Sequence, residues 1–311
     1  MTFWVVLWSS VLAVVATCNV VAWGGSASSL WFQRRSLTPR VLAYRRMQLV
    51  LSAGYVFGCG FRSFLPVFDV PRVALVDSFL STAAVGRSVA TVAELCFVAQ
   101  WALLLRETSR LTDNAVHNMA SRLVFPLIVA AEVCSWYSVL TTSNLGHVFE
   151  ESLWSVATAL IVASFVADWQ RWDARWRSAM AWLATAGMLY LLYLVFTDVP
   201  MYWSRWVADE HAGKAYLSLP QGWLSASGPH VVSYAWNIWK SELAWMAAYF
   251  SVAVWISIWL VHAPLPTSCR QPGAAPLRTA FVSAQPALIQ WRLRRQSASC
   301  KSMSRASGAG D

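Results

Sequence analysis

The stretch SFLSTAAVGRSVATVAELCFVAQWALLLRE, Ser78–Glu107, decides how the rest of the sequence is interpreted. It is apolar and long enough to cross a bilayer, yet it carries Arg87 and Glu94 within the span. A charged side chain at membrane depth is costly, so it normally faces a partner or a water-filled cavity. The spacing of these two residues is about two helical turns, which returns both to nearly the same helix face. The stretch therefore predicts a membrane-spanning helix that forms one wall of a polar site.

The composition of the whole chain indicates the same class. Of 311 residues, 57% are hydrophobic and 13% are charged, and several apolar runs reach bilayer length, which excludes an ordinary soluble domain. The formal net charge of +9 does not indicate nucleic-acid binding, because the basic residues lie between apolar spans as membrane topology requires. The six cysteines lie within apolar spans or in the C-terminal tail, so no structural disulfide is expected.

We predict an all-α polytopic membrane protein, with a bundle of seven transmembrane helices over residues 1–261 and a basic, disordered tail rich in Ser, Ala and Pro over residues 262–311. The predicted spans are Phe3–Val21, Met47–Pro66, Ser78–Glu107, Leu123–Thr142, Glu150–Trp169, Ala179–Thr197 and Trp236–Val261. Gly54 and Gly58 have the spacing of close helix packing. The sixth span is expected to end at Asp198–Pro200, and Met201–Ala235 is expected to lie outside with its tryptophans in the headgroup layer.

The basic residues predict the orientation, because basic connectors stay on the cytoplasmic side. Most of the 24 lysine and arginine residues fall in the connector after the first span, the connectors after the third and fifth spans, and the tail. The N-terminus is therefore predicted outside and the C-terminus in the cytoplasm. A bacterial inner membrane and a eukaryotic plasma membrane or endomembrane both fit. The lipid bilayer is the predicted partner, a small-molecule or lipid ligand is a further possibility, and the sequence indicates neither a cofactor nor an oligomeric state.

The ionisable residues of the spans gather in the half that is predicted to be outer. This distribution describes a cavity that is open to the outside and sealed towards the cytoplasm. We predict that its charged residues bind a small polar or amphipathic ligand, for sensing or transport, and that the two arginines hold an anionic group. The predicted ligand-binding residues are Arg62, Arg87, Glu94, Glu132, Asp198 and Glu242.

Glu94 and Glu132 lie at similar depth on adjacent antiparallel spans. Two facing carboxylates in a medium of low dielectric cannot both stay ionised without a cation, so one carries a proton or Arg87 neutralises the pair. Such a pair suits a proton relay, and the alternative is a hydrogen bond between neutral carboxyls that only holds two helices together. Glu150, at the start of the fifth span, is interpreted as favouring the helix N-terminus through the helix dipole.

Two alternative functions stay open. The segment Cys59–Arg62, with Arg87 and with His147 in an outer loop, resembles the exosortase-type membrane transpeptidases, although the spacing departs from that family. The resemblance implies a membrane-embedded enzyme that acts on a lipid or lipid-linked substrate at the outer leaflet, with Cys59 as a nucleophile activated by His147. The other alternative is a structural or assembly role. No metal site is predicted, because the outer histidines lack the spacing of a helix-borne zinc pair.

A short internal similarity indicates a possible duplication. Val67–Pro71, after the second span, is similar to Val195–Pro200, after the sixth. Spans one to three and five to seven then become parallel repeats joined by the fourth span, a plan that resembles the small sugar transporters. The Pro-Gln signature of that group is absent from the sequence, and no family is assigned.

Overall fold

The computed structural model describes residues 2–265, except for positions 71, 113, 168, 170, 171, 173, 229 and 241. Most of this part of the chain is helical, as predicted for an all-α protein. The helices are α1 (Thr2–Gln33), α2 (Pro39–Phe64), α3 (Ala83–Thr112), α4 (Ala115–Thr141), α5 (Leu145–Ala167), α6 (Ala174–Tyr193), α7 (Val199–His211), α8 (Leu219–Ser227), α9 (Trp236–Trp239), α10 (Leu243–Ala248) and α11 (Val254–Leu260). The π-helical segments η3 (Leu194–Asp198) and η4 (Tyr249–Ala253) join α6 to α7 and α10 to α11. Nearly all of the predicted tail lies outside the described residues.

Within the described part, five helical segments are long and apolar enough to cross a membrane: Phe3–Gln33, Ala83–Leu111, Ala115–Thr141, Leu145–Ala167 and Trp176–His211. The segment Trp245–Leu260 is apolar but shorter. α2 has the length of a span, and its buried side carries polar residues such as Gln48, Ser52 and Arg62. The chain is therefore an integral membrane protein built from α-helices. The count of seven spans and the orientation stay predictions.

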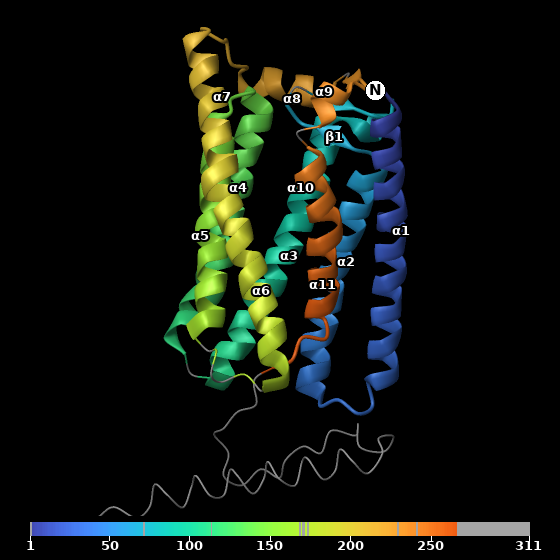
Figure 1. Ribbon diagram of the computed structural model, residues 1–311, viewed down its shortest axis with the longest axis vertical. Coiled ribbons are helices and arrows are strands. Elements are labelled where there is room, and N and C mark those ends of the chain that lie inside the picture. Colours follow the sequence, from blue (N-terminus) through green and yellow to red (C-terminus); the bar gives the residue numbers. More distant parts are fainter. Residues whose placement is uncertain are drawn as a thin grey trace, which may run out of the picture. The chain divides into compact units, whose positions relative to one another are not determined.

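The long helices lie side by side in chain order. α1 packs on α2, α2 on α3, α3 on α4, α4 on α5, and α5 on α6. α10, η4 and α11 form a further rod, orange in Figure 1, whose α11 segment packs on α1, α2 and α3. An apolar cluster with Val5, Tyr55 and Phe250 joins this rod to α1 and α2, and a second cluster joins α3, α4 and α5. The polar side chains of the bundle thus lie between well-packed apolar contacts.

Two glycines let α2 approach α3 closely, as their spacing predicts. A Cβ atom added at Gly54 would meet Cys96 Sγ at 2.5 Å, and one added at Gly58 would meet Ala93 Cβ at 2.7 Å. At Gly58 the contact is with Ala93 Cβ, which has no side-chain rotation to relieve it, and at Gly54 the Cys96 side chain would have to move. The predicted role of these glycines in helix packing is confirmed.

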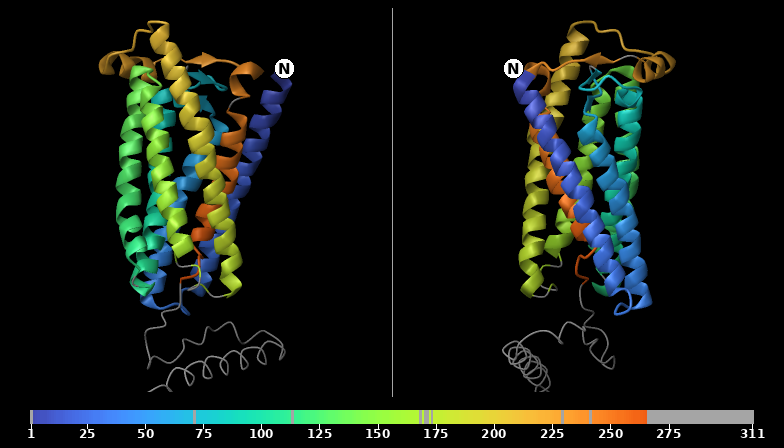
Figure 2. Two further views of the ribbon diagram at one scale, coloured as in Figure 1. Left: turned by 60° about the vertical axis from the view of Figure 1, so that its left-hand side comes forward. Right: turned by 90° about the vertical axis from the view of Figure 1, so that its right-hand side faces the viewer.

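Short elements gather at one end of the bundle, which we call the sheet end (Figure 1). Strands β1 (Val67–Phe68) and β2 (Val73–Ala74) form an antiparallel hairpin after α2, and β3 (Val231–Val232) pairs with β2 in parallel. The one-turn helix η1 (Phe79–Ser81) leads into α3. α8 lies across this end of the bundle and packs on α3 and α4 (Figure 2). The α1–α2 connection lies at the opposite end, which we call the loop end.

The sixth predicted span does not end at Asp198–Pro200. The helix continues from Trp176 to His211. The π-helical segment η3 accommodates Pro200, because the Val199 N–H bonds to Leu194 O, one residue further back than in an α-helix. A proline inside a helix normally kinks or breaks it, and a π-turn of this kind lets the helix continue past the proline. The span was predicted to exit at Asp198–Pro200, whereas the apolar helical segment continues to His211. α1 is also longer than predicted, ending at Gln33 rather than near Val21.

The proposed internal duplication is contradicted by the local structures of its two motifs. Val67 and Phe68 form strand β1, whereas Val195–Asp198 lies within the π-helical segment η3. One motif begins a hairpin and the other continues a helix. The sequence similarity therefore does not mark a structural repeat.

Candidate functional site

Four charged side chains from three adjacent helices meet in the bundle, and we call them the charge cluster: Arg87 and Glu94 of α3, Glu132 of α4 and Glu150 of α5. The two α3 residues share one helix face, as their spacing predicts, and Arg87 Nη2 lies 3.4 Å from Glu94 Oε2. Glu132 faces them from α4, as expected from its depth. The chain therefore places three acids around a single arginine.

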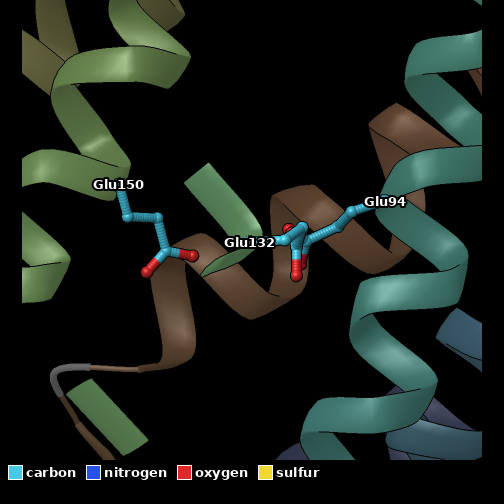
Figure 3. Close-up of side chains that lie close together, drawn as sticks. All are labelled: Glu94, Glu132 and Glu150. Carbon is cyan, nitrogen blue, oxygen red and sulfur yellow. The ribbon is translucent and has the colours of Figure 1, made fainter. Parts of the chain in front are cut away.

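Arg87 holds the central position of the charge cluster. Its Nη2 atom lies 2.6 Å from Glu132 Oε2 and 3.5 Å from Glu150 Oε1. All four side chains are only 5% to 10% exposed. Figure 3 shows the three carboxyl groups turned towards a common region, and one oxygen of each lies within 4.8 Å of the others.

Neighbouring polar groups hold two of the carboxyl groups in place. Thr91 Oγ1 donates to Glu132 Oε2 at 2.6 Å, and Trp136 Nε1 donates to Thr91 Oγ1 at 3.1 Å. His147 Nδ1 lies 2.7 Å from Glu150 Oε2, and its ring centroid is 4.8 Å from that of Tyr202 on α7. The charge cluster thus has a supporting layer of hydroxyl, indole and imidazole groups.

The charges of the cluster do not balance. One guanidinium supplies a single positive charge for three carboxyl groups, and two like charges about 4 Å apart repel by about 4 kcal/mol at an effective dielectric constant of about 20. Buried carboxylates in this position need protons or another cation. Glu132 Oε1 and Arg87 Nε are also buried without a hydrogen-bond partner. The geometry is therefore suited to taking up positive charge.

Carboxyl oxygens are the ligands that hard divalent cations prefer. Arg87 Nη2 lies among the same oxygens, within 2.6 to 3.5 Å of each. The arginine thus acts as a cation that the chain itself supplies, and an added metal ion must share or take its position. Outside the charge cluster, Asp209 Oδ2 accepts from Asn144 Nδ2 and Lys214 Nζ, and Glu210 Oε1 accepts from Tyr216 Oη, so protein groups already engage these two acids.

The other predicted ligand-binding residues have separate surroundings. Arg62 Nη2 donates to Val67 O at 3.2 Å and so supports the hairpin after α2. Glu242 Oε2 accepts from Trp245 Nε1 at 2.6 Å. Asp198 lies in the π-helical segment η3. Glu242 is thus engaged by an indole group and Arg62 by the hairpin.

The predicted catalytic pair of Cys59 and His147 does not form in the structure. Cys59 is 2% exposed and belongs to the apolar cluster that contains Tyr55 and Val56. His147 bonds to Glu150 on its own helix. The thiol is therefore part of the apolar packing between helices, and the imidazole supports the charge cluster through Glu150.

The structure corrects the interpretation of Glu150. The sequence favoured a helix-dipole role, but the residue lies one turn inside α5 with its side chain 6% exposed and an oxygen facing Arg87. Thr91 and Trp136 were also missed. The available signal was their spacing, because each follows a charged residue of the cluster, Arg87 or Glu132, by four positions and so shares its helix face.

A second polar group was missed nearer the loop end. Gln48 Nε2 donates to Gln100 O at 3.0 Å and Gln100 Nε2 donates to Gln48 O at 3.1 Å, so the two side chains join α2 and α3 reciprocally. Gln100 Nε2 also donates to Ser257 O at 3.1 Å, and Ser257 Oγ donates to Gln100 Oε1 at 2.6 Å. We call Gln48, Gln100 and Ser257 the amide clasp. All three are fully buried and uncharged.

Comparisons with protein-family models, curated proteins and solved structures find no match for this chain, so no family is assigned.

Proposed function

We propose that the charge cluster is a proton-binding site that couples protonation to the binding of a small polar or amphipathic ligand, for sensing or transport across the membrane. The observation that carries this proposal is the arrangement of three buried carboxyl groups around one guanidinium, at 2.6, 3.4 and 3.5 Å. Since the cluster has a deficit of positive charge, a change of protonation or of bound cation is the simplest way for it to change state.

In this proposal the bundle has seven spans, with the sheet end outside and the loop end in the cytoplasm. The basic connector between α1 and α2, with Arg34 and Arg35, supports that orientation. The ligand reaches the charge cluster from the sheet end, and the amide clasp closes the path towards the loop end.

The charge balance favours a cationic or neutral ligand over the anion that the two arginines suggested. Arg87 is already engaged by carboxyl groups and Arg62 by a backbone carbonyl. An ammonium group that enters beside Glu94 and Glu150 displaces protons from the cluster.

The test measures proton release from purified protein in weakly buffered detergent solution with a pH-sensitive dye. Methylammonium is the cationic probe and acetate the anionic one. The wild type is expected to release protons on adding methylammonium and none on adding acetate. Glu94→Gln is expected to lose most of the release, because the amide cannot carry the exchangeable proton.

The matched control is Glu107→Gln. Glu107 lies on the same helix, but it pairs with the more exposed Arg40 at 2.8 Å and Arg110 at 2.7 Å, so its carboxylate is already balanced. This variant is expected to keep the wild-type release. If the wild type releases no protons with either probe, or if both variants respond alike, the cluster only holds the helices together and the proposal fails.

A further inference from the structure

α8 presents three different faces. Its buried face consists of Gly222 and Ala226, one turn apart. A second face carries apolar side chains that stay largely exposed: Leu219 at 54%, Trp223 at 53% and Leu224 at 73%. The third face carries the exposed polar residues Gln221 and Ser225. A short helix with an exposed apolar side and an exposed polar side is the pattern of a helix that lies at a membrane surface.

The contacts of α8 show which way its apolar face points. Gly222 rests against the backbone of Leu140 near the end of α4, so closely that no side chain would fit. The Trp223 ring pairs with that of Trp136 at a centroid distance of 6.3 Å. Trp136 precedes Leu140 by one turn of α4, about 6 Å nearer the middle of the bundle. Trp223 therefore points from α8 back along the membrane-spanning part of α4.

The surface of α4 below α8 is apolar and open. Val133 is 67% exposed and Tyr137 is 48% exposed, as expected of side chains that face lipid. Figure 2 shows α8 lying across the end of the bundle rather than in line with the long helices. The apolar face of α8 thus continues the lipid-facing surface of α4.

The sequence around α8 identifies the chemistry of its partner. No Asp, Glu, Lys or Arg occurs between Lys214 and Lys240. A surface without charge cannot make ion pairs with a soluble protein or a nucleic acid. Tryptophan beside leucine, with amide and hydroxyl groups on the other side, matches the boundary between acyl chains and headgroups.

We propose that α8 is an interfacial helix whose Leu219–Trp223–Leu224 face is seated in the lipid interface at the sheet end. The apolar face of α8 is connected to the charge cluster by a series of side-chain contacts. Trp223 pairs with Trp136, Trp136 donates to Thr91, and Thr91 donates to Glu132. Lipid contact at α8 therefore helps to position Trp136 and Thr91 beside the charge cluster.

The test places an environment-sensitive fluorescent amino acid at position 224 or, as the matched control, at position 225 on the polar face of the same helix. The full-length protein is reconstituted into phosphatidylcholine vesicles with plain or brominated acyl chains, since bromine quenches fluorophores that it contacts. Quenching is expected to be several-fold stronger at position 224 than at position 225. The pair 219 and 221 repeats the comparison if the probe at position 224 prevents folding.

Equal quenching at the apolar and polar positions overturns the proposal, as does quenching at neither, which would mean that protein covers the apolar face. Neither result depends on proton exchange at the charge cluster. The proposed position of α8 in the lipid interface and the proposed proton-binding function can therefore fail separately.

Discussion

The bundle contains two buried polar groups that differ in kind. The charge cluster, towards the sheet end, brings three carboxyl groups to one guanidinium. The amide clasp, towards the loop end, uses uncharged amides that donate and accept across α2, α3 and α11. Both groups join helices, but only one has an unbalanced charge.

Because of this difference, the charge cluster can change its protonation or its bound cation, whereas the amide clasp keeps one set of hydrogen bonds. Hydrogen bonds between amides and backbone carbonyls have no proton to gain or lose near neutral pH, so they stabilise one arrangement of the helices. The charge cluster gains or loses protons or cations, and its preferred geometry changes with them. We therefore expect the loss of stability on disrupting the charge cluster to depend on pH. The loss on disrupting the amide clasp is expected to be independent of pH.

The largest effect is expected for Arg87→Leu. The substitution leaves three buried carboxyl groups without their cation, and breaking a buried ion pair costs about 3–5 kcal/mol of unfolding free energy. Thermal unfolding in detergent is expected to show a large loss of stability near neutral pH. The loss is expected to shrink as the pH falls, because protonated carboxyl groups no longer need the guanidinium.

Arg110→Leu is the matched control for that variant. Arg110 lies on the same helix and pairs with Glu107, but its side chain is 49% exposed, so the loss is expected to be below about 1 kcal/mol. An Arg87→Leu protein as stable as the control would show that the charge cluster contributes nothing to the fold. A large defect that does not change with pH would mean that packing, rather than charge, causes it.

A smaller effect is expected for Gln100→Leu, which breaks the amide clasp. Gln48 O and Ser257 O lose a donor and Ser257 Oγ loses one of its two acceptors, at a cost of about 1–3 kcal/mol. The loss is expected to be the same across the pH range in which Arg87→Leu varies. Gln33→Leu, at the half-buried end of α1, is the control with the same chemical change and is expected to unfold close to the wild-type temperature. A pH-dependent defect in Gln100→Leu would remove the distinction between the two groups.

The smallest effect concerns His262, which follows α11 at the loop end. Burial is the main cause that lowers the pKa of its imidazole below the ordinary value of 6.5, the charge of Arg45 lowers it further, and the contact with Ser26 acts in the opposite direction. Ser26 Oγ lies 2.8 Å from Nε2. Since the folded state disfavours the protonated ring, its contribution to stability is complete above the unfolded pKa and is lost as the pH falls below that value.

His262→Gln keeps a hydrogen-bonding side chain beside Ser26 and removes the titration. The difference in unfolding temperature between wild type and variant is therefore expected to move against the wild type as the pH falls from about 7.5 to about 5.5. A difference that stays constant over this range would mean that the pKa of the imidazole is the same in the folded and unfolded states.

The sequence predicted the parts of the site that lie on one helix and one contact between neighbouring helices. Arg87 and Glu94 face each other along α3 because helical periodicity alone returns them to one face. Gly54 and Gly58 marked a close helix contact for the same reason. Equal depth on adjacent spans was enough to bring Glu132 opposite Arg87.

Composition and periodicity by themselves thus determined that this is a helical membrane protein with a charged α3 face. Only the tertiary structure decided that Glu150 completes the charge cluster, that Arg62 turns to the hairpin, and that the helix continues through Pro200. Periodicity determines where a side chain lies on its own helix. The rotation of each helix against its neighbours depends on packing across the whole bundle, and that packing chooses which side chains meet.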